Sequence, residues 1–316
     1  MNEIEKHDRR KFIKKSVSMG IAAGSALMFG KPGNLFAKQA APGVPELVEV
    51  RNGEPDAMFN KAIELMGGMS KYVRKGQTVV VKPNIGWNKR PEVGANTNPL
   101  LVKTVVQHCF QAGAKKVYVF DNVAYSSTGM AEQCYKNSGI EDAAKSAGAL
   151  VTPADNEKYF QKVEVPGGKS LKTTAVHELV LESDVLINIP VLKNHRGTHL
   201  TIAMKNLMGI VWDRLAYHYS DLDQCIADFC LYKKPALNIV DAYRVMMKDG
   251  PQGTVPENAA LKKTLLISED IVAIDAAATK IFGRKPEEIK YIKMANELGI
   301  GNMNPDELKI KKVVMS

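Results

Sequence analysis

The sequence predicts an α/β fold in which a mostly parallel sheet is flanked by helices in Rossmann-like layers, with one inserted β-hairpin. Short β-branched runs alternate with longer segments of helical period, which is typical of such a sheet. A Pro166-Gly167-Gly168 turn interrupts the alternation and predicts the hairpin over residues 163–176. The 45% content of hydrophobic residues is that of an ordinary globular protein and excludes disorder and coiled coil.

The first half of the chain is predicted to run βαβαβ before the hairpin. Its expected strands and helices, in chain order, are 46–51, 56–73, 78–82, 99–112, 116–120 and a further helix at 140–147. Each of these strands is a short apolar run, and each helix repeats its apolar residues every three or four positions. The pattern indicates strands that lie parallel and are joined by crossover helices.

The second half continues the alternation after the hairpin. A buried strand is expected at 184–189, helices at 201–211 and 221–232, strands at 236–240 and 264–267, helices at 271–282 and 286–298, and an edge strand at 308–314. No repeat or linker is evident, so residues 38–316 are predicted to form one domain.

Residues 1–37 have the order of a twin-arginine signal peptide. Arg9 and Arg10 precede a weakly apolar stretch at 17–29, and Ala37 is a small residue suited to cleavage. The stretch is shorter than the roughly 20 apolar residues of a membrane span. We expect recognition by the twin-arginine export machinery and a periplasmic location. A cytoplasmic helix with two arginines and an uncleaved signal anchored in the inner membrane remain alternatives.

Charge and cysteine spacing restrict the partners. The formal net charge of +9 comes largely from the signal region, and the remaining lysines are scattered, so nucleic acid is excluded and a small anionic molecule is favoured. The four cysteines form no Cys-x-x-Cys pair, so we expect no iron–sulfur cluster within the chain. We expect these cysteines to be buried free thiols. The cofactor stays unidentified, although the export route carries folded proteins and fits a preloaded group or a redox-enzyme partner.

Polar residues follow four of the predicted strands. These residues are Lys82 with Asn84, Asp121, Lys193 with His195, and Asp241. In an open parallel sheet the ligand crevice lies outside the carboxyl ends of the strands, so the four groups are expected to converge. The alternative is that strands end at the surface, where Asn and Asp favour turns.

The segment from Lys193 to Gly209 supplies further candidates. We expect Lys82, Lys193 and Lys205 to bind an anion, with Asn84, Asn206 and the bare backbone of Gly250 and Gly253 beside it. His195 or His218 would transfer a proton, and Asp121 and Asp241 would orient these groups. If Thr198 or Thr201 caps the following helix, its first amides would also favour an anion.

A metal site is an alternative to acid–base chemistry. His195 and His199 are four residues apart, which suits a metal on a helix face, but Gly197 between them argues against a regular helix. A metal-dependent enzyme using His195, His199 or His218 with Asp121 or Asp241 therefore stays an alternative, and no metal ligand is assigned. No nucleotide-binding glycine motif or nucleophile elbow is present.

The chain resembles the domain-of-unknown-function family 362 (DUF362) over nearly all of its mature part. The resemblance is carried by Lys82-Pro83-Asn84, Asp121, Pro190-Val191-Leu192-Lys193-Asn194-His195, Thr198, Lys205-Asn206-Leu207-Met208-Gly209, Tyr217-His218, Ile239-Val240-Asp241, Gly250-Pro251, Gly253 and Ala273-Ile274-Asp275-Ala276. It implies a fold and site positions but no reaction. Many members look like iron–sulfur proteins because they carry ferredoxin-type cysteine runs, and this chain has none.

The sequence therefore predicts a periplasmic enzyme, or a partner of a redox enzyme, that holds a small anionic ligand or cofactor at the carboxyl edge of the sheet. The rival hypothesis is a non-catalytic carrier or solute-binding protein that uses the same lysines.

Overall fold

The computed structural model describes residues 44–124, 130–152 and 154–316, which belong to one compact unit that begins at Lys38. The predicted signal peptide lies outside the described residues. Among the helices described, none has both the length and the apolar character needed to cross a bilayer.

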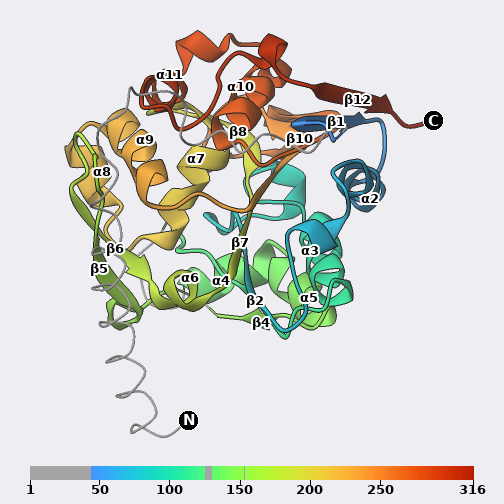
Figure 1. Ribbon diagram of the computed structural model, residues 1–316, viewed down its shortest axis with the longest axis horizontal. Coiled ribbons are helices and arrows are strands. Elements are labelled where there is room, and N and C mark those ends of the chain that lie inside the picture. The colour runs from blue at the N-terminus through green and yellow to red at the C-terminus, as the bar shows by residue number, and fades with distance from the viewer. Residues whose placement is uncertain (1–43, 125–129, 153) are drawn as a thin grey trace, which may run out of the picture. The chain divides into compact units, whose positions relative to one another are not determined.

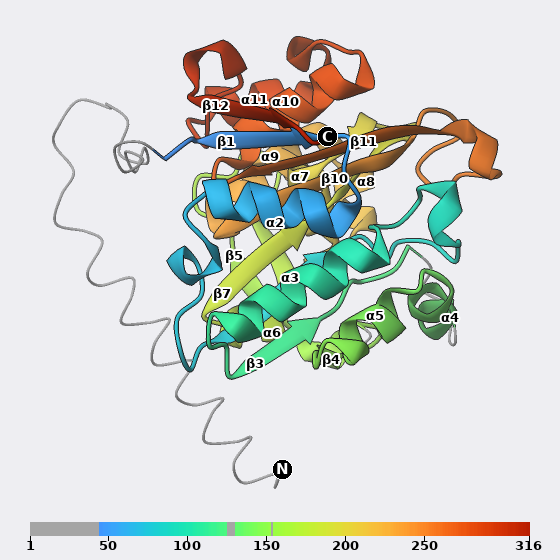
Figure 2. The ribbon, with the colours of Figure 1, turned by 90° about the vertical axis from the view of Figure 1, so that its right-hand side faces the viewer.

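The main sheet is mixed and mostly parallel (Figures 1 and 2). Its parallel part has the order β4 (Leu150–Val151), β3 (Lys116–Val119), β2 (Thr78–Pro83), β7 (Val185–Ile189) and β10 (Leu237–Met246). Next to β10 the sheet continues with β11 (Ala259–Ser268), β1 (Leu47–Arg51) and the edge strand β12 (Ile310–Val314). β11 is antiparallel to both neighbours, and β12 is parallel to β1. The predicted α/β fold with a mostly parallel sheet is confirmed.

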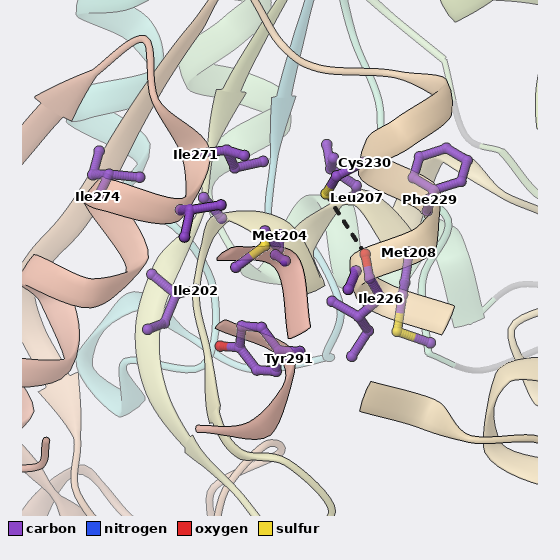
Figure 3. Close-up of a cluster of buried hydrophobic side chains, with 14 of the residues drawn as sticks. Ile202, Met204, Leu207, Met208, Ile226, Phe229, Cys230, Ile271, Ile274 and Tyr291 are labelled. Carbon is purple, nitrogen blue, oxygen red and sulfur yellow. Dashed lines mark hydrogen bonds between the residues drawn. The ribbon is translucent and has the colours of Figure 1, made fainter. Parts of the chain in front are cut away.

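Alternate residues of each strand face opposite helical layers. In β2, Val79 and Val81 pack with α2 (Pro55–Leu65), α3 (Pro99–Gln111), α4 (Met130–Asn137) and α5 (Ile140–Ser146), whereas Val80 faces the other layer. That second layer contains α7 (Ala203–Asn206), α9 (Leu222–Tyr232), α10 (Ile271–Phe282) and α11 (Lys290–Glu297). Figure 3 shows Met204 and Leu207 of this layer among Ile226, Phe229 and Tyr291. Because the period is two, Lys82 points toward α7.

A row of buried polar residues crosses the sheet on the α7 side. The register aligns Lys82 of β2 with Asn188 of β7, Asn238 of β10 and Ser268 of β11. Asn188 donates to the Ala203 carbonyl and to the Asn238 side chain, both at 3.0 Å. The row therefore ties α7 to the sheet at the place where β2 ends.

Three predicted helices are shorter than expected, and the one expected over 286–298 begins as the 3₁₀ helix η6 (Pro286–Glu288) before α11. The helix expected over 56–73 ends at Leu65, because Gly67 and Gly68 adopt positive φ, and Met69–Lys71 is a separate 3₁₀ turn. The segment expected to be helical over 201–211 is instead the end of a strand, then α7, then the 3₁₀ helix η4 (Leu207–Ile210).

The hairpin is confirmed, although it forms a separate two-stranded sheet. Its strands are β5 (Phe160–Glu164) and β6 (Thr173–His177). The sequence did not predict a second hairpin, β8 (Val191–His195) with β9 (His199–Thr201), which extends from the main sheet through β10. Helices α4, α6 (Glu178–Glu182) and α8 (Leu215–Tyr219) and the strand β4 were also missed, since they are too short for clear periodicity.

Candidate functional site

The candidate site lies where the strand order reverses. From β2 the chain proceeds outward to β3 and β4, and it then returns to place β7 on the other side of β2. Carboxyl ends of parallel strands at such a switch point frame a crevice. A cavity of about 1000 Å³ opens here, and its walls include the ends of β2, β3, β8 and the α7–η4 segment.

One half of the cavity wall is fully paired. Lys82 Nζ lies 2.8 Å from Asp121 Oδ1, and the two side chains are only 1% and 2% exposed. Asp121 Oδ2 accepts a bond from the Ile85 amide at 2.6 Å. Burial lowers the pKa of Lys82 and raises the pKa of Asp121, and the attraction between the two charges opposes both shifts. Each charge of the pair therefore depends on the other for compensation inside the protein.

Asn206 connects this pair to the rest of the wall. Its Oδ1 accepts from Lys82 Nζ at 2.9 Å and from Asn84 Nδ2 at 2.8 Å, and its Nδ2 donates to Asn188 at 2.8 Å. These bonds use the donor and acceptor ends of the amide at once. Asn206 thus joins the ends of β2 and β7 to α7.

Gly209 makes room for the ion pair. A Cβ at this position would lie 1.8 Å from Asp121 Oδ1 and 2.5 Å from Lys82 Nζ. The Gly209 carbonyl also accepts from the Asn122 amide at 2.8 Å. The Lys205-Asn206-Leu207-Met208-Gly209 segment therefore brings an amide and a bare backbone against the Lys82–Asp121 pair.

The other half of the wall carries positive charge without a carboxylate. Lys193 is buried and donates to Asn84 Oδ1 at 3.0 Å and to the Ala95 carbonyl. Lys205 is 7% exposed, and within the described residues its Nζ donates only to the Met208 sulfur, at 3.4 Å. Burial lowers the pKa of Lys193 to about 7 and that of Lys205 to about 8.

His195 lies beside these lysines as a neutral imidazole. Its Nδ1 accepts from the amides of Gly197, at 3.0 Å, and Thr198, at 3.3 Å, so its proton is on Nε2. Burial, followed by the charges of Lys205 and Lys193, lowers the pKa of His195 to about 2. This geometry favours hydrogen-bond donation over the predicted proton transfer. His218, on α8, is exposed at the cavity rim, and burial lowers its pKa as well.

The start of α7 is not available to a ligand. The amides of Ala203 and Met204 donate to the buried carboxylate of Asp275 at 2.7 and 3.1 Å. The expected anion site at this helix start is therefore wrong, because the Asp275 carboxyl of α10 already accepts from these amides. Thr198 donates to the Leu200 carbonyl. The Thr201 hydroxyl lines the cavity, is buried and has no partner among the described residues.

Three predicted site residues lie outside the cavity wall. Asp241 accepts from the amides of Asn98, at 2.7 Å, and Tyr243, at 3.0 Å, and so holds the start of α3. Gly250 packs against the β8 backbone, where a Cβ would lie 1.8 Å from the Asn194 carbonyl. Gly253 has a φ of +69° and shapes the turn. The other predicted residues line the cavity together: Lys82, Asn84, Asp121, Lys193, His195, Lys205, Asn206 and His218.

Residues 79–280, which include all of these cavity residues, match the model of the Domain of unknown function (DUF362). This chain belongs to the DUF362 family. It is 26% identical over 253 residues to a thylakoid-associated protein of Synechocystis sp., which covers 77% of this chain and 75% of the relative.

Two solved structures are distantly similar to this DUF362 chain. The lactate racemase apoprotein of Thermoanaerobacterium thermosaccharolyticum aligns with a TM-score of 0.44 and 11% identity, over 82% of this chain and 58% of that one. A protein from Thermotoga maritima aligns with a TM-score of 0.39 and 12% identity, over 78% and 60%. The chain thus spans less than two thirds of either protein.

Sequence reasoning missed several cavity residues of this DUF362 protein, among them Trp87, Thr201, Trp212 and Arg214. Trp87 and Trp212, the two tryptophans of the chain, both line the cavity. Arg214 donates to the carbonyls of Asn122, at 2.8 Å, and Val123. Thr201 was considered only as a helix cap. Their position in the sequence could have indicated them, since Trp87 closely follows Asn84, and Trp212 and Arg214 closely follow Gly209.

Metal and thiol chemistry receive no further candidates. In the part of the chain that the structure describes, no three His, Cys, Asp or Glu side chains cluster closely enough to hold a metal ion. Cys109, Cys134, Cys225 and Cys230 are buried free thiols, and none of the four is among the residues that line the cavity.

Proposed function

We propose that this DUF362 protein binds an organic anion in the switch-point cavity, with Lys193 and Lys205 as its charge partners. The observation that carries the proposal is that both lysines are buried in the wall and neither forms an ion pair with a described carboxylate. An uncompensated buried charge costs several kcal/mol. A bound carboxylate or phosphate would remove that cost and raise the pKa of both lysines.

The dimensions of the cavity support an organic anion rather than an inorganic one. A volume of about 1000 Å³ is that of a site for a cofactor or a molecule of drug size. Trp87 and Trp212 add apolar ring surface beside the polar groups of the wall. The ligand we propose has an anionic group that meets the lysines and an apolar or planar part that meets the tryptophans.

The other donors in the wall support recognition of anionic oxygens. His195 Nε2–H, the Thr201 hydroxyl and the Arg214 guanidinium all line the cavity. The carboxylates other than Asp121, namely Asp155, Glu157 and Asp213, lie on exposed parts of the wall. The buried end therefore favours the anionic group.

Native mass spectrometry of the processed protein, compared with the same chain denatured, tests the proposal. We expect a retained mass, or else calorimetric binding of an aromatic carboxylate or phosphate. Lys193→Met combined with Lys205→Met should abolish either result, and Lys262→Met, at an exposed position of β11, should not. Binding that survives the double substitution, or no binding at all, contradicts the proposal.

Protonation provides a second test of the same site. Because the anion favours the ammonium forms, binding should take up protons above pH 7 and weaken as the pH rises past about 8. Calorimetry in two buffers with different ionisation enthalpies measures this uptake. Binding without proton uptake at pH 8 would contradict the assignment of these lysines.

We also propose that the protein acts in the periplasm after twin-arginine export. The order of Arg9, Arg10, the apolar stretch at 17–29 and Ala37 supports this. Replacing both arginines by lysine should leave the precursor in the cytoplasm, as measured by cell fractionation. A processed periplasmic protein in that double variant would overturn the proposal.

A further inference from the structure

Lys205 differs from the other two lysines that the structure places in the cavity wall. Lys82 Nζ contacts Asp121 and Asn206, and Lys193 Nζ donates to Asn84 and Ala95. Within the described residues, Lys205 donates to no oxygen atom, and its contact is the Met208 sulfur, a weak acceptor. Lys205 Nζ is thus the lysine nitrogen of this wall that remains available to a ligand within the described structure.

The environment of Lys205 favours the neutral amine. Burial is the largest influence and lowers its pKa to about 8, with Arg214 adding to the effect and Asp223 opposing it. About a tenth of the side chain is then an uncharged amine at pH 7, whereas an exposed lysine with a pKa of about 10.4 is almost entirely ammonium. A neutral amine is the form of lysine that attacks carbonyl carbon.

We propose that Lys205 forms an imine with an aldehyde or ketone group of the bound organic anion. This inference rests on the proposed function, since the anion-binding wall brings the carbonyl to the amine. In the step, the Nζ lone pair forms a C–N bond and the carbonyl π electrons move to oxygen. The two amine hydrogens then leave with that oxygen as water, and the C=N bond remains. No oxidant or reductant is consumed.

Neighbouring groups fit the two demands of this step. The anionic group, bound beside Lys193, keeps that lysine as an ammonium and leaves Lys205 free to react as the neutral amine. Strand register pairs Lys193 with Thr201 across β8 and β9. The Thr201 hydroxyl, buried and unpartnered in the described structure, can donate to the departing oxygen and accept in turn. His195 adds a neutral Nε2–H donor in the same wall.

Reductive trapping tests the proposal with two matched probes. Pyridoxal 5′-phosphate carries an aldehyde, a phosphate and a ring, and pyridoxine 5′-phosphate replaces the aldehyde by an alcohol. The full-length exported protein is treated with a limiting amount of the aldehyde and cyanoborohydride, digested and mapped by mass spectrometry. We expect the first adduct at Lys205, and we expect the alcohol to slow that labelling without protecting the exposed Lys262.

The two arms separate the imine from the binding site. If the alcohol binds but the aldehyde leaves no preferential adduct at Lys205, the imine proposal is overturned and the anion site stands. If neither probe binds and labelling follows exposure alone, both proposals fail. An adduct at Lys193 in place of Lys205 also overturns the inference.

Lys205→Arg provides the matched variant, because arginine keeps the positive charge and lacks a nucleophilic amine at these pH values. It should form no adduct at that position, and labelling of the exposed Lys262 should match that of the parent. In the parent, the preference for labelling Lys205 over exposed lysines should be largest below about pH 8 and should be lost toward pH 10, where the anion binds weakly and the exposed lysines also become neutral. Equal pH profiles at Lys205 and Lys262 would overturn the inference.

Discussion

The two halves of the cavity wall contain the same chemical group in opposite circumstances. Lys82 Nζ lies 2.8 Å from Asp121 and also donates to Asn206, so the protein itself compensates the charge of Lys82. Lys205 is also buried, yet in the described structure its Nζ donates only to the Met208 sulfur. Lys82 lies near the end of β2, and Lys205 lies on α7.

The difference indicates that burial alone does not define a ligand group. The Lys82–Asp121 pair joins the ends of β2 and β3 to η4, which is a structural task. Lys205 joins no elements through the described contacts. The cost of burying it is best explained by a ligand that neutralises its charge or reacts with it. Substitutions on either side of the cavity wall test this difference between Lys82 and Lys205.

The largest effect is expected on the paired side. Lys82→Met should destabilise the protein by about 3–5 kcal/mol, because it leaves the Asp121 carboxylate buried without its cation. Urea unfolding at pH 7 measures this loss. A change below about 1 kcal/mol would show that the pair is not the structural half of the wall.

A smaller loss is expected from crowding the same pair. Gly209→Ala should cost about 1–3 kcal/mol, because the new Cβ would collide with Asp121 Oδ1 and Lys82 Nζ. Gly197→Ala is the control, since its Cβ would approach His195 no closer than 3.5 Å. Equal denaturation midpoints for the two variants would argue against a close approach at Gly209.

On the open side, Lys205→Met is expected to change the pH dependence of stability. Since the folded-state pKa of Lys205 is about 8, below the unfolded value of about 10.4, the unfolded chain binds more protons between these pH values. The unfolding free energy of the ligand-free parent should therefore rise relative to the variant by about 1 kcal/mol per pH unit from pH 8 to 10. Parallel curves from urea unfolding at three pH values would refute the assignment.

The smallest effect concerns a carboxylate that the sequence placed in the site. Asp241→Asn should cost about 1 kcal/mol, because the carboxamide has an oxygen for only one of the Asn98 and Tyr243 amides. Anion affinity should stay unchanged, because Asp241 lies outside the cavity wall. A tenfold loss of affinity, or about 1.4 kcal/mol, measured by calorimetry on the folded variant would return Asp241 to the site.

Much of the sheet could be predicted because its signal is local. Each central strand is a run of β-branched residues that faces a helical layer on both sides, as in Val79 to Val81. The convergence of Lys82, Asp121 and Lys193 also followed from the rule that strand ends share an edge. These predictions needed no knowledge of packing.

The rest depended on contacts between distant segments. Lys193, Asn194 and His195 form a strand although they are polar, because β8 pairs with β9 and β10. The state of His195 depends on two nearby amides and on its burial, and the sequence pattern reports neither. Asp275 accepts hydrogen bonds from the first amides of α7 although it lies 72 residues farther along the chain, and no helix-capping pattern reveals such a contact.

The placement of both tryptophans has a practical consequence. The chain contains two, Trp87 and Trp212, and both line the cavity. Its intrinsic indole fluorescence therefore originates at the site itself, with no background from elsewhere in the protein. Binding, imine formation and release can be followed in real time by stopped-flow emission, without a label that would alter the wall.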